Sequence, residues 1–170
     1  MRSMFAKLMS TAVVAVAVAV AAGAPAPSQA QMPMQMTDAM ESGVVTAKSA
    51  YPMAETIARL KKDVADKGIM FFNEIDQAKL ASGANIQLRP SVLLVFGNPP
   101  LGTQFLTSNP LSGLDWPVRL LVFQDKDGQV WTAYTDFTWI AHRHGIADRD
   151  EQFKMASMVI ASITSSVAAK

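Results

Sequence analysis

The sequence predicts an α+β protein: a single domain with a twisted, mostly antiparallel sheet of about five strands and two long helices packed on one face. Three observations support this fold class. Apolar residues recur at helical spacing over residues 53–64 and again over residues 153–167. Two β-rich runs flank the turn DKDG at residues 125–128, as in a hairpin. The connections between the expected strands are unequal, which favours α+β over a regular βαβ repeat.

The first half of the domain alternates strands and helices. We expect strands at residues 44–48, 69–75 and 92–96, the third apolar on both faces. Pro52 suits the first position of a helix that ends at Gly68, where a left-handed residue is needed. Asp76 is expected to cap a short helix over residues 77–82, and a second short helix is expected over residues 102–107.

The second half begins with the hairpin, whose strands we place at residues 118–124 and 129–135. A helical turn is expected over residues 137–144. Asp148 and Glu151 have capping-box spacing and are expected to open the last helix. The core face of that helix is predicted from five apolar residues: Phe153, Ala156, Ile160, Ile163 and Val167.

The N-terminus is interpreted as an export signal spanning residues 1–30. Arg2 and Lys7 precede an Ala/Val run over residues 11–22, and Ser28-Gln29-Ala30 offers small residues for cleavage after Ala30. The alternative is an uncleaved anchor, but the apolar run is short for a bilayer span. We therefore expect a periplasmic or secreted protein with no membrane contact after cleavage.

The composition of the remaining 140 residues excludes some functions. The chain has no cysteine, so disulfides and thiol chemistry are excluded. After removal of the signal, the chain has 13 Lys and Arg residues and 14 Asp and Glu residues, and no basic stripe is visible in the sequence. We therefore expect no nucleic-acid partner.

Residues 31–42 are interpreted as a flexible, methionine-rich tail that precedes a single domain at residues 43–168. Clustered thioethers can ligate Cu(I), a soft cation. Met32, Met34 and Met36 are therefore a candidate copper site; the simpler interpretation is a tail without a metal. No other cofactor is predicted.

The stretch VFGNPPLGT at residues 95–103 has the glycine spacing of a phosphate-binding loop. Pro99 and Pro100 have no N–H to offer a phosphate, and Thr103 stands where such loops carry lysine. We interpret it instead as a stiff turn between Gly97 and Gly102 that presents a ligand edge or an interface. Similarly, Asp125-x-Asp127 lacks the later ligands of a calcium loop and is interpreted as a turn.

Several further residues could carry chemistry. His142 and His144 could share a metal on a strand but diverge on a helix, where His144 would instead cap the helix end. Glu74 and Asp76 could form a carboxylate pair, although Asp76 is more simply a helix cap. Arg89 and Arg119 could bind an anion. Large aromatic residues near the hairpin favour an interface or a pocket: Trp116, Trp131, Tyr134 and Trp139.

Residues 44–163 resemble the domain-of-unknown-function family 302. The resemblance rests on ordered short matches: Gly97-Asn98-Pro99, Gly102-Thr103, Leu114 with Pro117, Asp127-Gly128, Tyr134 and His144-Gly145. It implies a small α/β domain that tends to form homodimers and has no established activity. Where many members have Asp-His, this chain has Asp76-Gln77, which argues against a shared histidine site.

The sequence thus favours a non-enzymatic, homodimeric binding or interaction module with room for a small-molecule ligand. The alternative is a hydrolase or isomerase using Glu74 or Asp76 with Arg119 or His144. The ligand or interface candidates are Gly97, Asn98, Pro99, Gly102, Thr103, Trp116, Arg119, Trp131, Tyr134 and His144.

Overall fold

The computed structural model describes residues 42–169, and its elements confirm the predicted fold class. In chain order they are β1 (Val44–Lys48), α2 (Met53–Asp66), β2 (Met70–Asp76), α3 (Gln77–Gly83), β3 (Ser91–Gly97), α4 (Pro99–Ser108), the 3-10 helix η1 (Pro110–Leu114), β4 (Val118–Gln124), β5 (Val130–Thr135), α5 (Phe137–Arg143) and α6 (Asp150–Ser165). The interpretations of residues 1–30 and of the tail methionines lie outside the described residues.

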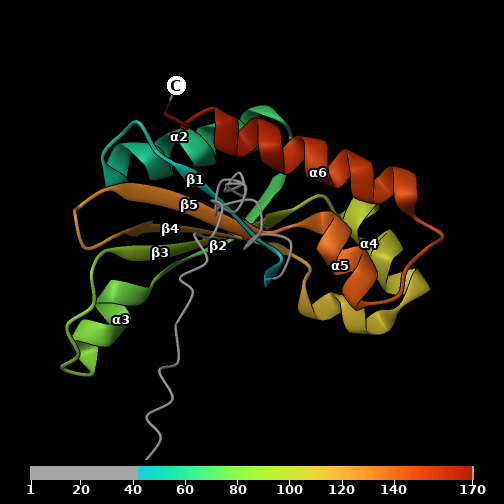
Figure 1. Ribbon diagram of the computed structural model, residues 1–170, viewed down its shortest axis with the longest axis horizontal. Helices are drawn as coiled ribbons and strands as arrows, with labels where there is room; N and C mark the ends of the chain where they lie inside the picture. The colour runs from blue at the N-terminus through green and yellow to red at the C-terminus, as the bar shows by residue number, and fades with distance from the viewer. Residues whose placement is uncertain (1–41, 170) are drawn as a thin grey trace, which may run out of the picture. The chain divides into compact units, whose positions relative to one another are not determined.

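The five described strands form one sheet in the order β1-β5-β4-β3-β2, and every neighbouring pair is antiparallel. The long helices α2 and α6 lie on one face of this sheet, as Figure 1 shows. The short helix α3 projects on the opposite side, and α4, η1 and α5 gather at one end. The prediction of two long helices on one face is therefore confirmed.

The core lies between the sheet and the two long helices. Leu60 and Val64 of α2 and Ile160 and Ile163 of α6 are buried there, as their helical spacing predicts. The strands contribute alternate residues to this core. They are Leu94 and Phe96 of β3 and Leu120 and Val122 of β4, all at most 2% exposed. The residues that alternate with them, such as Leu93, Val95 and Leu121, therefore face the other side of the sheet.

Two predicted helix starts are wrong. The helix after β3 begins at Pro99 rather than at residue 102, with both prolines in its first turn. That position suits proline because the first N–H groups of a helix have no partner inside it. The last helix begins at Asp150 with Arg149 as N-cap, and Asp148 instead accepts a hydrogen bond from Ser108 Oγ. The expected capping box is therefore absent from α6.

The indole of Trp116 packs closely against the end of β3 and the first turns of α4, because Gly97 and Gly102 have no side chains there. A Cβ atom on Gly102 would lie 1.7 Å from Trp116 Nε1, and one on Gly97 would lie 3.2 Å from the same atom. The rings of Phe72 and Trp116 also pack in a T-shaped arrangement, with centroids 6.2 Å apart. Trp116 thus joins the loop after η1 to the two elements that flank the turn at Asn98.

The substitution Gly102→Ala tests this close approach. We expect it to lower the free energy of unfolding by about 3 kcal/mol, because the new methyl group would overlap an indole that also packs against Phe72. Urea denaturation followed by tryptophan fluorescence measures the change. Gly83→Ala is the matched control, since a Cβ there meets nothing within 4 Å. The control should change stability by less than about 1 kcal/mol; equal losses in the two variants would contradict the account.

Candidate functional site

An apolar groove of about 420 Å³ lies between α6, the start of α4 and the residues that precede β2. Its apolar walls are Ile69, Leu101, Met155, Met158 and Val159. Met155 and Met158 are 51% and 58% exposed although they lie on a helix that packs on the sheet. A continuous apolar surface of this kind, open to solvent, is typical of a binding site.

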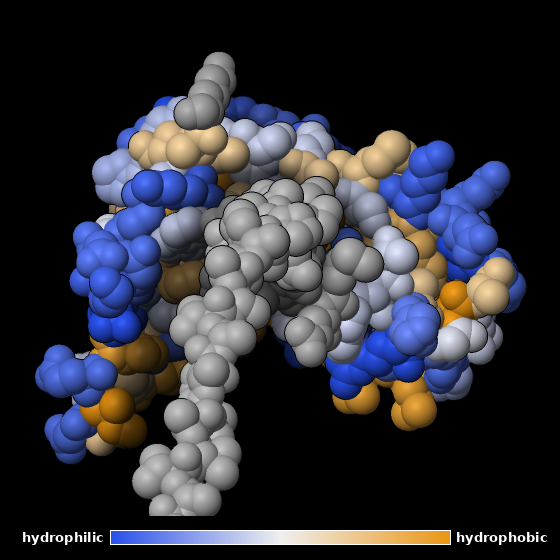
Figure 2. Space-filling model, viewed as in Figure 1, coloured by the Kyte–Doolittle hydropathy of each residue, from blue (hydrophilic) through white to orange (hydrophobic). Residues whose placement is uncertain are grey.

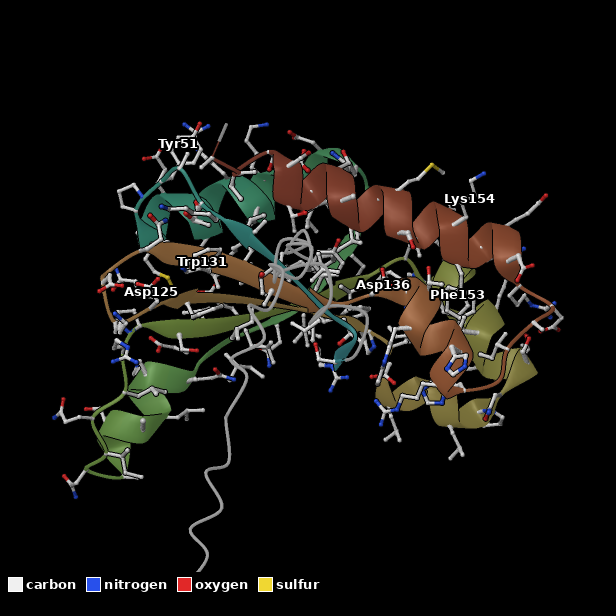
Figure 3. The ribbon with its side chains drawn as sticks, in the orientation of Figure 1. Tyr51, Asp125, Trp131, Asp136, Phe153 and Lys154 are labelled. Carbon is white, nitrogen blue, oxygen red and sulfur yellow. The ribbon has the colours of Figure 1, made fainter. Side chains whose placement is uncertain are left out.

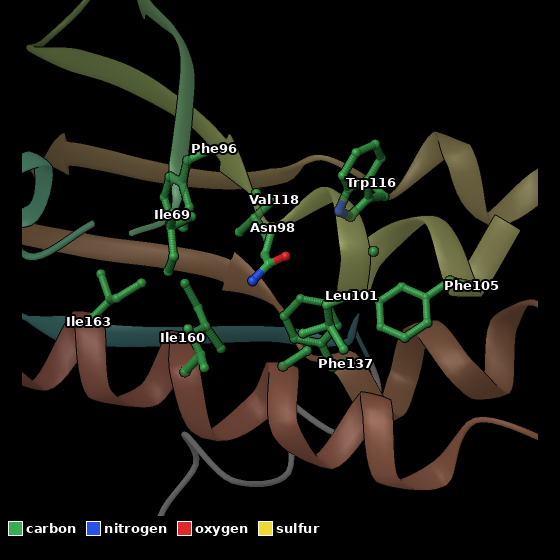
Figure 4. Close-up of a pocket in the computed structure, with 14 residues that line it drawn as sticks. Ile69, Phe96, Asn98, Leu101, Phe105, Trp116, Val118, Phe137, Ile160 and Ile163 are labelled. Carbon is green, nitrogen blue, oxygen red and sulfur yellow. The ribbon is translucent and has the colours of Figure 1, made fainter. Parts of the chain in front are cut away.

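The groove continues inward to a cavity of about 40 Å³, and the two spaces share Ile69, Asn98, Leu101 and Val159. Aromatic residues form much of the inner wall, as Figure 4 shows: Phe96, Phe105, Trp116 and Phe137. Phe105 is fixed in turn by stacking on Phe153 of α6, with ring centroids 4.1 Å apart. The inner cavity is therefore a preformed apolar space with stiff walls.

Asn98 is the polar residue that both spaces share (Figure 4). It occupies the N-cap position of α4, yet its side chain makes no capping hydrogen bond. An asparagine at this position usually accepts one from the helix backbone. The amide of Asn98 therefore keeps its hydrogen-bonding capacity for another partner.

The first turn of α4 confirms that this loop cannot bind phosphate as a nucleotide loop does. Pro99 and Pro100 have no N–H. The next two backbone N–H groups, of Leu101 and Gly102, both donate to the carbonyl of Asn98, over 3.1 and 2.8 Å. The Thr103 hydroxyl donates to the carbonyl of Pro99 over 2.7 Å. The backbone N–H groups of Leu101 and Gly102 and the Thr103 hydroxyl are therefore already engaged and do not form a phosphate cradle.

A polar cluster surrounds the carboxylate of Asp115, whose side chain is 3% exposed. Arg119 Nη2 lies 2.9 Å from Asp115 Oδ1, and Arg143 Nη1 lies 3.1 Å from Asp115 Oδ2. His144 Nε2 lies 2.7 Å from the same Oδ2. The cluster ties the segment after η1 to β4 and to the end of α5.

Arg119 and His144 are among the candidates that the sequence suggests, but their common partner, Asp115, is not. Asp115 precedes Trp116-Pro117 in the stretch LDWP, which carries part of the family resemblance. Nothing in that stretch shows that an aspartate in a loop will be buried. His144 is the C-cap of α5, as expected, and its backbone N–H donates to the carbonyls of Ile140 and His142. Its ring binds Asp115, which was not expected.

Glu74 and Asp76 do not join this cluster. Glu74 forms an ion pair with Lys61 of α2, and Asp76 accepts the N-cap hydrogen bond from the backbone of Lys79. Glu74 pairs with Leu94, which pairs with Leu120, so Glu74 lies on the helix-covered side of the sheet. Arg119 is the neighbour of Leu120 in β4, so its side chain points to the opposite side of the sheet. The structure therefore does not bring Glu74 to Arg119.

The hairpin aromatics have structural partners. The indole N–H of Trp131 donates to Asp125 Oδ2 over 2.7 Å at the β4–β5 turn, where the two residues appear together in Figure 3. This hydrogen bond is the main cause that lowers the pKa of Asp125. Tyr134 packs at the edge of the core, where burial and, to a smaller extent, Asp136 raise its pKa. The residues 125–128 form a turn, as predicted.

Within residues 42–169, no group of three or more His, Cys, Asp or Glu residues is placed to hold a metal ion. The same range contains no helix of the length and apolarity that a bilayer crossing requires. The copper hypothesis for Met32, Met34 and Met36 concerns residues before this range and stays a prediction.

The face of the sheet opposite α2 and α6 carries partly exposed apolar residues. Leu93 and Val95 of β3 and Leu121 and Phe123 of β4 point to this face and are incompletely covered. Exposed leucines and an isoleucine flank it at both ends: Leu80, Ile86 and Leu88 in or after α3, and Leu111 and Leu114 in η1. Figure 2 shows the two apolar ends as separate patches on the same side of the molecule.

The substitution Asp115→Asn tests the polar cluster. It removes the negative charge that Arg119, Arg143 and His144 contact. We therefore expect a loss of about 2 kcal/mol in the free energy of unfolding. The loss is smaller than for a fully buried pair because Arg119 and Arg143 are 49% and 45% exposed and regain water. Urea denaturation measures it. Asp66→Asn, which removes a solvent-exposed partner of Lys62, should change stability by at most about 0.5 kcal/mol.

Comparison with known proteins assigns the family. A solved structure of an uncharacterised DUF302 protein from Bacillus stearothermophilus superposes with a TM-score of 0.67 at 20% identity, over 74% of this chain and 98% of that one. Two proteins named fluoride-specific ion channels are 36% identical over 111 residues: FluC 1 of Brucella suis biovar 1 (strain 1330) and FluC 2 of Brucella melitensis biotype 1 (strain ATCC 23456). The chain spans 44% and 41% of their lengths. The model of the family "Domain of unknown function DUF302" matches residues 45–163, and the chain belongs to this family.

Proposed function

We propose that this protein is a non-enzymatic, homodimeric binding module that is exported to the periplasm or beyond. The observation that carries the proposal is the partly exposed apolar face of the sheet opposite α2 and α6. Leu93 of β3 pairs with Leu121 of β4, which pairs with Ala133 of β5, so a row of apolar side chains crosses the middle of this face. Homodimer interfaces are apolar in the same way.

A second copy of the chain suits this face because the two apolar ends make it complementary to itself. A two-fold axis through the sheet would bring the end formed by α3 of one copy over the end formed by η1 of the other. The two sheets would then pack face to face across the row of Leu93 and Leu121, at the usual spacing of about 10 Å. Such an interface is isologous: it uses the same patch twice.

The polar cluster supports a structural role for the charged residues more than a catalytic one. Both oxygens of Asp115 are already engaged by Arg119, Arg143 and His144. A general base needs an open position toward its substrate. The buried contact between Asp115 and His144 is the observation that keeps a hydrolase or isomerase as the second candidate function, with these residues in place of Glu74 or Asp76.

The similarity to the Brucella channels concerns less than half of each of those proteins. We propose that the shared part serves there as the same kind of interaction domain. Fluoride binding by this chain does not follow from the shared part alone, because the rest of the channel length is not matched.

Light scattering coupled to size-exclusion chromatography tests the dimer. We expect a mass of two chains at micromolar concentration. Ile86→Glu should shift the mass toward one chain, because it places a charge in the apolar contact. Ile86 is 60% exposed in the single chain, so the substitution should leave folding intact.

Met155→Glu is the matched control: it adds the same charge at a residue of similar exposure on α6, on the other side of the sheet. It should leave the dimer unchanged. A monomeric wild-type protein, or dimers that both variants disrupt equally, would contradict the proposed interface.

A further inference from the structure

We infer that the groove between α6 and α4 binds a small neutral amphiphile: an aliphatic chain that lies along the groove and an uncharged head group that hydrogen-bonds to Asn98. The site is separate from the proposed dimer face, since α6 lies on the opposite side of the sheet (Figure 1). The inference therefore does not depend on dimerisation.

The size and the apolar walls of the groove indicate that the ligand carries an aliphatic chain. Its volume of about 420 Å³ falls in the range of small-molecule pockets. Met155 and Met158 lie one helical turn apart on α6 and form its outer rim. Methionine side chains are flexible and polarisable, so they adapt to an aliphatic ligand. Covering them also removes exposed apolar surface from water.

The inner cavity can accommodate the end of the ligand's aliphatic chain. It shares the wall residues Ile69, Leu101 and Val159 with the groove, so the two spaces adjoin. The inner wall beyond them consists of aromatic and aliphatic side chains, including Phe105 and Trp116 (Figure 4). A cavity of about 40 Å³ admits the end of an aliphatic chain but leaves little room for a branched group.

The charge of the lining indicates a neutral head group. Lys67 is the charged residue among the groove walls, and its Nζ lies 2.8 Å from both carboxylate oxygens of Asp63. This pair leaves little net charge at the mouth for an anion or a cation. Asn98 and Ser162 are the other polar wall residues, and both side chains are uncharged hydrogen-bond donors and acceptors. A hydroxyl, ester or amide head therefore fits better than a carboxylate or an ammonium.

Three probes with the same eight-carbon chain separate the possibilities: monooctanoyl glycerol, octanoate and octylammonium. Each is titrated calorimetrically into the full chain below its micelle concentration. We expect saturable binding of one monooctanoyl glycerol per chain, and affinities at least about tenfold lower for the two charged probes. Absence of saturable binding, or equal binding of all three probes, would overturn the inference.

Asn98→Ala tests the head-group contact. Because Asn98 makes no capping hydrogen bond, its removal should leave the melting temperature nearly unchanged. The affinity for monooctanoyl glycerol should fall by about five- to tenfold, as expected for one lost hydrogen bond. An unchanged affinity would remove Asn98 from the site and with it the assigned ligand class.

Met158→Glu tests the apolar wall. A carboxylate on the rim should weaken binding more than about tenfold, because the ligand would have to displace its water. Ala161→Glu is the control, since Ala161 is exposed on the same helix but does not line the groove. It should leave the affinity unchanged. Equal losses in the two variants would indicate a general charge effect and overturn the placement of the ligand in the groove.

Discussion

The close packing of Trp116 against Gly97 and Gly102 is the constraint on which the rest of the site depends. A Cβ at Gly102 would overlap the indole. The chain can therefore enter α4 directly after β3 only because residue 102 has no side chain. The approach brings Leu101 and Phe105 to face α6. The groove and the inner cavity thus depend on one contact, between Gly102 in the first turns of α4 and the indole of Trp116.

The residue before Trp116 fixes the loop from the other direction. Asp115 is buried among Arg119, Arg143 and His144, and these residues come from β4 and from the end of α5. Consecutive residues therefore perform two tasks: the carboxylate anchors the segment, and the indole forms a wall of the cavity. Two of the short stretches that carry the family resemblance, LDWP and HG at residues 144–145, meet at this anchor.

Much of the fold could be predicted from the sequence, because the apolar patterns of α2, α6 and the β4–β5 hairpin are local and strong. Leu60 and Val64 are buried as their spacing indicates. The start of α4 was missed because two consecutive prolines also suit a turn, and only the packing of Gly102 decides between the two. The start of α6 was missed because Asp148 has a competing partner in Ser108, distant in sequence.

The site was predicted only in part. Gly97, Asn98, Gly102 and Trp116, four of the residues that the sequence suggested, line the inner cavity, whereas Met155 and Met158 of the groove were not among those candidates. Their positions on α6 fit an ordinary amphipathic helix, and the groove exists only once α4 is placed beside it. Asp115 was missed for the same reason: its burial depends on cations from two distant segments. Sequence patterns report which residues face a core, but they do not report which surface a neighbouring element leaves open.

If the residues around Trp116 that carry the family resemblance build a ligand pocket, the fluorescence of Trp116 reports ligand binding most directly. With Trp131 and Trp139 replaced by phenylalanine, Trp116 is the remaining tryptophan of the chain. Titration with monooctanoyl glycerol should then shift its emission to shorter wavelength, saturating at one ligand per chain, because the ligand excludes water beside the indole. An emission spectrum that stays unchanged while the same ligand binds would show that the pocket beside Trp116 is not the site.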